Sequence, residues 1–275
     1  MSDPRPGTEP NDDTLTLLLT NDDGIDATGI WDLQKELAAI ATVIVAAPES
    51  EQSGVGHAFT FNMPIHYERQ SLSKGRDGFA VCGTPVDCVK FGISFLLQKR
   101  PDAVVAGINA GENSGLSAFY SGTVAAAREG AFWDIPSFAF SLCKGGERYR
   151  RQYAAVAADL LSHLLSRERI RKNHRVYYNI NFPPCSVKEC RGIRVTSQSM
   201  AFFDDRYETI DVESHRTKKG YVIYGEKKDI ETSDDYDSRA LMDRYIAITP
   251  LSFDATAHKR LDCLRDIEGR KVTTR

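Results

Sequence analysis

The chain has 275 residues, of which 41% are hydrophobic and 27% are charged, and its formal net charge at pH 7 is −3. This composition is typical of a globular protein with a large buried core. The slight acidic excess gives no basis for a stable nucleic-acid complex, and no apolar run approaches the roughly 20 residues of a membrane-spanning helix.

The N-terminus and the cysteines bear on localisation. Residues 1–13 are polar and contain Pro4, Pro6 and Pro10, which predicts a short disordered leader and no secretory signal. The six cysteines form no C-x-x-C pair, so we expect free thiols in a reducing compartment. A cytoplasmic location follows from both observations.

Strands and helices alternate along the first two-thirds of the chain. The leucine-rich run at 15–20 predicts a buried strand, and apolar residues at helical spacing predict a helix over 30–40. Further strands are predicted at 42–47, 103–106, 137–142 and 176–182, with helices at 84–97, 122–132 and 153–165. Such alternation predicts an α/β fold with a mostly parallel sheet and helices on both faces.

The pattern changes after Pro184. Short β segments are expected at 193–197 and 220–224, an acidic loop at 229–237 and a last strand at 245–248. We therefore divide the chain into the leader at 1–13, a core at 14–184 and a C-terminal extension at 185–275, which contains a hairpin and a final strand or helix.

The first predicted strand ends at an acidic pair, Asp22-Asp23, which Gly24 follows. In an open parallel sheet, ligands bind beyond the carboxyl ends of the strands. Two adjacent carboxylates are costly unless a cation neutralises them, and hard ions such as Mg²⁺ take oxygen ligands. The pair taken alone is also compatible with a simple Asp-Gly turn.

Two further oxygen donors follow the next two strands of the predicted sheet. Ser53 lies in the polar loop after the second strand, and Asn109 lies just after the third. A hydroxyl, an amide and two carboxylates, completed by water, suit one Mg²⁺ or Mn²⁺ ion. We therefore predict a metal site formed by Asp22, Asp23, Ser53 and Asn109.

A glycine-rich stretch from Gly107 leads into the helix at 122–132. Such a stretch offers unpaired backbone amides and the positive end of the helix dipole, a combination that binds phosphate; a capped helix behind a loop is the alternative. No Walker motif is present, and no G-x-G-x-x-G turn closes the first strand. The predicted phosphate- and substrate-binding residues are Asn21, Gly54, Gly107, Asn113, Ser121, Gly122 and Thr123.

With these residues assembled, the chain resembles the SurE (survival protein E) family of metal-dependent nucleotidases. The similar segments run in order through most of the chain and are 17–30, 47–54, 83–89, 101–130, 179–183 and 248–251. The stretch from Tyr236 to Ala247 departs from the family pattern.

The resemblance implies a Rossmann-like three-layer core, with a β-rich C-terminal extension that is exchanged between the subunits of a homodimer or homotetramer. It implies hydrolysis of nucleoside 5′- and 3′-monophosphates, with short polyphosphate as a further substrate. The family's metal ligands fall on Asp22, Asp23, Ser53 and Asn109, with one divalent ion per subunit.

Two alternatives stay open. A metal-bound water can attack phosphorus, or Asp22 can attack directly and form an aspartyl-phosphate; Asp22 and Asp23 are the catalytic candidates in both cases. The alternative function is a receiver-like phosphoacceptor or ligand-sensing module, which also places acidic residues at strand ends. The length of this chain argues against such a small module.

Overall fold

The computed structural model describes residues 14–72, 76–167, 170, 175–211 and 219–270. The predicted leader at 1–13 lies outside these residues. Within the described ranges no helix is long and apolar enough to cross a lipid bilayer. All six cysteines lie in the described part of the chain and are free, as predicted.

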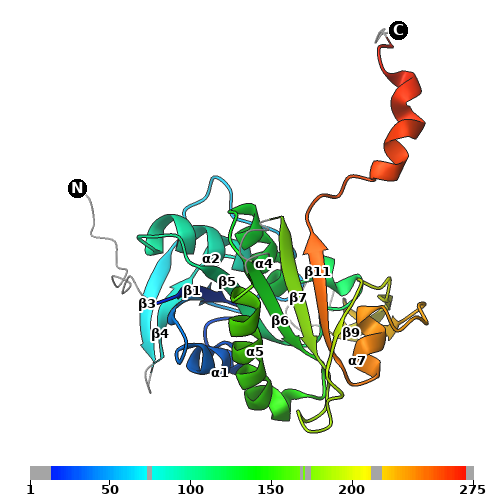
Figure 1. Ribbon diagram of the computed structural model, residues 1–275. Coiled ribbons are helices and arrows are strands. Elements are labelled where there is room, and N and C mark those ends of the chain that lie inside the picture. The colour runs from blue at the N-terminus through cyan, green and yellow to red at the C-terminus, as the bar shows by residue number, and fades with distance from the viewer. Residues whose placement is uncertain (1–13, 73–75, 168–169, 171–174, 212–218, 271–275) are drawn as a thin grey trace.

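A nine-stranded, mostly parallel sheet forms the centre of the molecule (Figure 1). Antiparallel pairing occurs between β3 and β4 and between β7 and β11. Side by side, the strands are β3 (Tyr67–Leu72), β4 (Arg76–Val81), β2 (Thr42–Pro48), β1 (Thr16–Thr20), β5 (Ala103–Ala110), β6 (Ser137–Leu142), β7 (Val176–Phe182), β11 (Ile246–Ser252) and β8 (Ile193–Val195).

Helices cover both faces of this sheet (Figure 1). The helices α1 (Thr28–Leu37) and α5 (Arg150–Leu165) pack on one face, and α2 (Pro85–Phe91) and α4 (Gly122–Phe132) pack on the other. The predicted α/β architecture is confirmed. Short helical segments are η1 (Gly92–Leu96), α3 (Ser117–Tyr120), η2 (Glu147–Tyr149), α7 (Asp237–Met242) and η3 (His258–Ile267).

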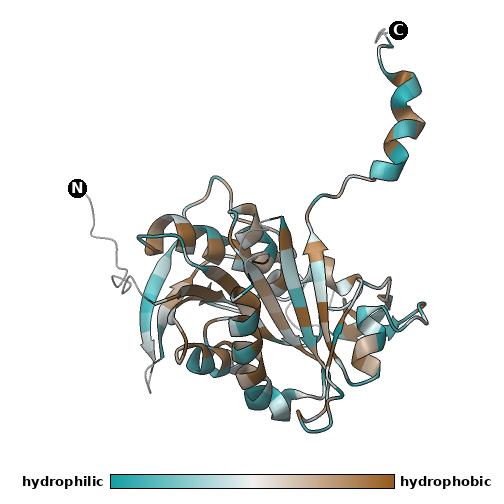
Figure 2. Cartoon of the chain, viewed as in Figure 1, coloured by the Kyte–Doolittle hydropathy of each residue, from teal (hydrophilic) through white to brown (hydrophobic). Residues whose placement is uncertain are grey.

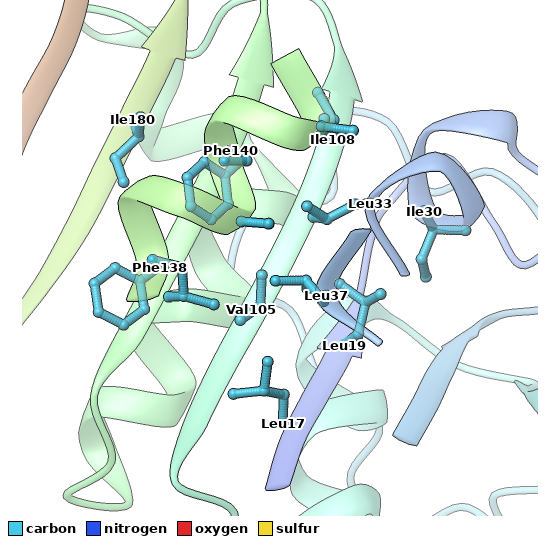
Figure 3. Packing of buried hydrophobic residues seen from close by; sticks show 14 of the residues in the cluster. Leu17, Leu19, Ile30, Leu33, Leu37, Val105, Ile108, Phe138, Phe140 and Ile180 are labelled. Carbon is cyan, nitrogen blue, oxygen red and sulfur yellow. The ribbon is translucent and has the colours of Figure 1, made fainter. Parts of the chain in front are cut away.

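Alternating side chains of the central strands fill the two layers between the sheet and the helices. In β1, Leu17 and Leu19 belong to the cluster that contains α1 and α5, whereas Leu18 belongs to the cluster on the opposite face. Figure 3 shows Leu33 of α1 and Val105 of β5 in the first cluster. Because both faces of these strands are covered, they form the continuous apolar runs seen in the sequence.

Three strands were not predicted from the sequence: β3, β4 and β9 (Phe202–Asp211). The polar edge strand β3 pairs with β4, and β9 pairs with β10 (Lys219–Lys228) in a separate two-stranded sheet. Figure 2 shows β3 as hydrophilic beside the largely hydrophobic central strands, and most residues of β9 and β10 are exposed. Because they lack a fully buried face, β3, β9 and β10 have no strong apolar periodicity. In β4 only the last four residues form a continuous buried run. The β segment predicted at 220–224 is the middle of β10.

The third predicted strand is longer than expected. The pairing of β5 with β6 shifts register after Ala106 and resumes at Asn109, so β5 continues to Ala110. The expectation that a loop begins at Gly107 is therefore wrong, and the loop begins at Gly111. The shift leaves Asn109 near the carboxyl end of β5, beside the end of β1.

The C-terminal part of the chain enlarges the main sheet. The strand β11 pairs with β7, and β8 lies outside β11. By contrast, η3 stands away from the rest of the molecule at the end of an extended segment (Figure 1), and all its residues are exposed.

Candidate functional site

The fold brings the ends of β1 and β5 together at the carboxyl edge of the sheet. The chain leaves β1 toward β2 on one side, whereas β5 pairs with the other side of β1. Such a reversal of strand order creates a crevice where α/β proteins bind ligands. Asp22 and Asp23 border it from β1 and Asn109 from β5, and the backbone N–H of Ala110 donates to Asp23 Oδ2 over 3.3 Å.

A pocket of about 260 Å³ opens at this edge. Three predicted metal ligands, Asp22, Ser53 and Asn109, line it. The loop that carries Ser53 is held there by a backbone hydrogen bond of 2.7 Å, from Gln52 N–H to the carbonyl oxygen of Asp22. Side chains from two loops and from the end of β5 thus line one pocket.

The start of α4 holds Asp22. The Thr123 hydroxyl donates to Asp22 Oδ1 over 2.5 Å, and the Thr123 backbone N–H donates to Oδ2 over 3.0 Å. Asp22 is only 4% exposed; this burial raises its pKa, although the hydrogen bonds from Thr123 oppose the rise. Gly122 allows the close approach, because a Cβ there would lie 2.8 Å from Asp22 Cβ.

Asp23 is half-buried beside Asp22. Burial, and next the negative charge of Asp22, raise the pKa of Asp23 to about 6. A neighbouring cation would favour the ionised form of both groups and remove this repulsion. The electrostatics of the pair therefore fit a divalent ion.

The two neutral donors are oriented by local hydrogen bonds. The Ser53 hydroxyl donates to Glu51 Oε1 over 2.6 Å, and the Asn109 side-chain N–H donates to the Gly111 carbonyl oxygen over 2.7 Å. In both residues this leaves lone pairs on oxygen for a cation. Among the described residues no cluster of three or more His, Cys, Asp or Glu residues could hold a metal, so a site here has to use these neutral oxygens.

The predicted phosphate-binding residues fall into two groups. Gly54, Asn113 and Ser121 line the pocket. The Ser121 oxygen accepts a hydrogen bond of 3.1 Å from Val124 N–H as the cap of α4, and its own hydroxyl proton stays available to a ligand.

The other four residues are not among those that line the pocket: Asn21, Gly107, Gly122 and Thr123. Both Thr123 donors are directed at Asp22, with Gly122 next to them. The Asn21 side-chain N–H donates to the Gly24 carbonyl oxygen over 2.8 Å and braces the turn after β1. Gly107 lies within β5, where a Cβ would be 2.3 Å from the carbonyl oxygen of Phe140.

Six residues that line the pocket were not predicted from the sequence: Ala110, Gly111, Glu112, Ser117, Tyr120 and Phe203. Tyr120 directly precedes the predicted cap Ser121. Its position beside this residue could have indicated from the sequence that it lines the pocket. Phe203 comes from β9, and no local pattern could place it at the ends of β1 and β5.

Comparison with known proteins identifies the relatives of this chain. The family model described as Survival protein SurE matches residues 17–205. The chain belongs to the SurE family. A SurE protein from Syntrophus aciditrophicus, named 5′-nucleotidase SurE, is 39% identical, and the alignment covers 94% of this chain and 96% of that protein.

Two other SurE proteins agree with this assignment. The Proteus mirabilis protein, named 5′/3′-nucleotidase SurE, is 37% identical, and the alignment covers 92% of this chain and 95% of that protein. The crystal structure of the SurE protein from Aquifex aeolicus superposes with a TM-score of 0.77 at 33% identity, and the match covers 92% of this chain and 99% of that one. The SurE fold thus extends over nearly the whole chain, including C-terminal strands.

Proposed function

We propose that this SurE protein is a divalent-metal-dependent phosphomonoesterase that hydrolyses nucleoside 5′- and 3′-monophosphates to nucleoside and phosphate. The observation that carries the proposal is one pocket lined by the Asp22 carboxylate, the neutral oxygen donors Ser53 and Asn109 and the cap hydroxyl of Ser121. The nucleotidase names of the relatives support the hydrolysis of nucleotides. The proposal includes hydrolysis of short-chain polyphosphate as a further activity.

In this proposal Asp22, Asp23, Ser53 and Asn109 hold one Mg²⁺ or Mn²⁺ ion per subunit. When bound, the ion offsets the negative charge of the phosphoryl oxygens. The Ser121 hydroxyl donates to another phosphoryl oxygen and orients the group.

Water is the nucleophile in this proposal. Both Asp22 oxygens accept hydrogen bonds from Thr123, and an attack by Asp22 on phosphorus would give up at least one of them. Hydrolysis in ¹⁸O-labelled water, with rapid quenching and a search for phosphorylated Asp22, separates the two routes. A trapped adduct on Asp22 would exclude direct attack by water.

Two exposed aromatic side chains favour nucleotides over smaller phosphate esters. Tyr120 is 69% exposed and Phe203 is 47% exposed, although both line the pocket. Stacking of a base on an aromatic side chain is worth about 1–3 kcal/mol. Comparing kcat/KM for a panel of nucleoside monophosphates with that for glycerol phosphate tests this part.

We expect an excess of EDTA to abolish phosphatase activity on nucleoside monophosphates, and Mg²⁺ or Mn²⁺ to restore it. The physical reason is that the pocket contributes few positive charges of its own to a dianionic phosphate. Full activity in EDTA would refute metal dependence. Phosphorylation of Asp22 or Asp23 without turnover would instead favour the receiver-like alternative.

The raised pKa of Asp23 gives a pH dependence for metal binding. Below pH about 6 the metal-free carboxyl group holds a proton, which has to leave before a cation binds. We therefore expect the apparent affinity for Mn²⁺ to fall by up to about tenfold per pH unit below this value and to level off above it. Calorimetry across pH 5–8 measures this, and a flat profile would contradict it.

We also propose a homodimer or homotetramer in the cytoplasm, with the C-terminal extension exchanged between subunits. The exposed η3 carries Leu261, Leu264 and Ile267, which are all about half exposed. A second copy of the chain would bury them. Light scattering after size-exclusion chromatography tests this; a monomer at micromolar concentration would contradict it.

A further inference from the structure

The segment from Gly111 to Gly115 forms one wall of the active-site pocket and connects β5 to α3. Three of its residues, Gly111, Glu112 and Asn113, line the pocket. The place of these residues relative to the metal ligands therefore depends on what fixes this segment.

The sheet fixes the middle of the segment. The backbone N–H of Asn113 donates to Asn181 Oδ1 over 2.7 Å, and Asn179 Nδ2 donates to the carbonyl oxygen of Asn113 over 2.7 Å. The side-chain N–H of Asn113 donates to Ser141 Oγ over 2.9 Å. These residues are at most 7% exposed, so β6 and β7 hold Asn113 from inside.

The C-terminal extension fixes the outer side. The Lys227 ammonium group of β10 contacts Ser114 Oγ at 2.6 Å, the Ser114 carbonyl oxygen at 3.2 Å and Glu112 Oε1 at 3.3 Å. Three acceptors match the three N–H donors of an ammonium group. The Lys227 side chain is 19% exposed in a strand whose residues are mostly exposed.

A second residue of the extension holds the end of the same segment. Asp237, which begins α7, is fully buried. Its Oδ2 accepts from the backbone N–H of Gly115 over 3.0 Å, and its Oδ1 accepts from Ser199 N–H over 3.0 Å. The segment is thus held between the sheet and the extension.

We propose that Lys227 is a positioning residue of the active site. It fixes Glu112 and Ser114 on either side of Asn113, and its ammonium group pairs with the carboxylate of Glu112, a residue that lines the pocket. Without this ammonium group, Glu112 would repel a dianionic phosphate. The inference rests on the proposed phosphatase function.

The Lys227→Met variant tests the proposal, with Lys228→Met as the matched control. Lys228 is the next residue of the same strand, and its ammonium group pairs with Asp204 on the exposed hairpin. We expect K227M to raise KM for AMP about tenfold or more while kcat changes by less than about threefold, because a lost charge contact acts on phosphate binding. K228M should keep both constants within about twofold of the wild type.

Three further variants separate a positioning role from a loss of folding. Lys227→Arg keeps the positive charge, so its KM should lie close to that of the wild type. Adding Glu112→Gln to K227M should give a lower KM than K227M alone, because no carboxylate is left to neutralise. Ser114→Ala removes only the shortest contact and should raise KM in the same direction, which keeps the proposal testable even if K227M does not fold.

Binding of inorganic phosphate in the presence of Mn²⁺, measured by calorimetry, makes the result independent of turnover. Weaker phosphate binding in K227M than in K228M supports the inference, even if the wild type proves inactive and the proposed function fails. Equal phosphate binding and equal KM in the two variants, with an active wild type, would overturn the inference and leave the function standing.

Discussion

Asp23→Asn is expected to remove phosphatase activity and, at the same time, to make the metal-free protein more stable at pH 7. Lewis-acid stabilisation is worth several kcal/mol, and about 1.4 kcal/mol corresponds to a tenfold change in rate, so kcat/KM should fall by about 10³-fold or more. In the proposed site, the ion would lose one of its two carboxylate ligands.

The gain in stability follows from the pKa of Asp23, which rises from 3.8 in a model compound to about 6 in the folded protein. An acid with a raised pKa stabilises the fold while it is protonated, and that contribution is lost as the pH rises from about 4 through about 6. At pH 7 the ionised carboxylate costs up to about 3 kcal/mol in the metal-free state, and asparagine avoids this cost.

Thermal unfolding in EDTA at pH 5 and pH 7, together with activity in Mn²⁺, measures both effects. About 1 kcal/mol corresponds to about 2–4 °C in Tm for a chain of this size. Asp26→Asn is the matched control, because Asp26 is an exposed residue in the same turn. If D23N kept its activity within tenfold of the wild type, or if its metal-free Tm did not exceed that of D26N at pH 7, the assigned role of Asp23 would be wrong.

Gly122→Ala should damage the site through packing alone. The new Cβ would lie 2.8 Å from Asp22 Cβ, 3.0 Å from Pro85 Cγ and 3.1 Å from Asp22 Oδ2. Because Asp22 and Pro85 are buried, α4 or Asp22 has to move. A displacement near 1 Å at a reacting site can cost about 10²-fold in rate, and overpacking typically costs about 1–3 kcal/mol of stability.

Ala126→Gly is the control for stability. Ala126 lies in the same helix, packs in the cluster between the sheet and α2 and α4, and does not line the pocket. Glycine in a helix interior costs about 1 kcal/mol, so A126G should be destabilised while its kcat/KM stays close to that of the wild type. If G122A matched A126G in both quantities, the contact of Asp22 with α4 would not matter for catalysis.

Local patterns were sufficient to predict the core of the fold. The strands β1, β2, β6 and β7 are buried, so each reads as a short apolar run whose end is visible in the sequence. The exposed hairpin β9–β10 lacks such a run, and the register shift in β5 depends on its pairing with β6. Both features depend on contacts between distant segments. For this reason only part of the hairpin was predicted, with β9 missing, and the end of β5 was misplaced.

The sequence by itself determined the chemical elements of the site: an acidic pair after the first strand, oxygen donors after the next two, and a capped helix behind a glycine-rich stretch. Each is a local signal, because strand ends and helix caps are set by neighbouring residues. Only the tertiary structure decided the partners of these groups. It directs Thr123 to Asp22, adds Phe203 to the pocket and brings Lys227 against Glu112, since side chains far apart in the sequence meet only through packing of the whole fold.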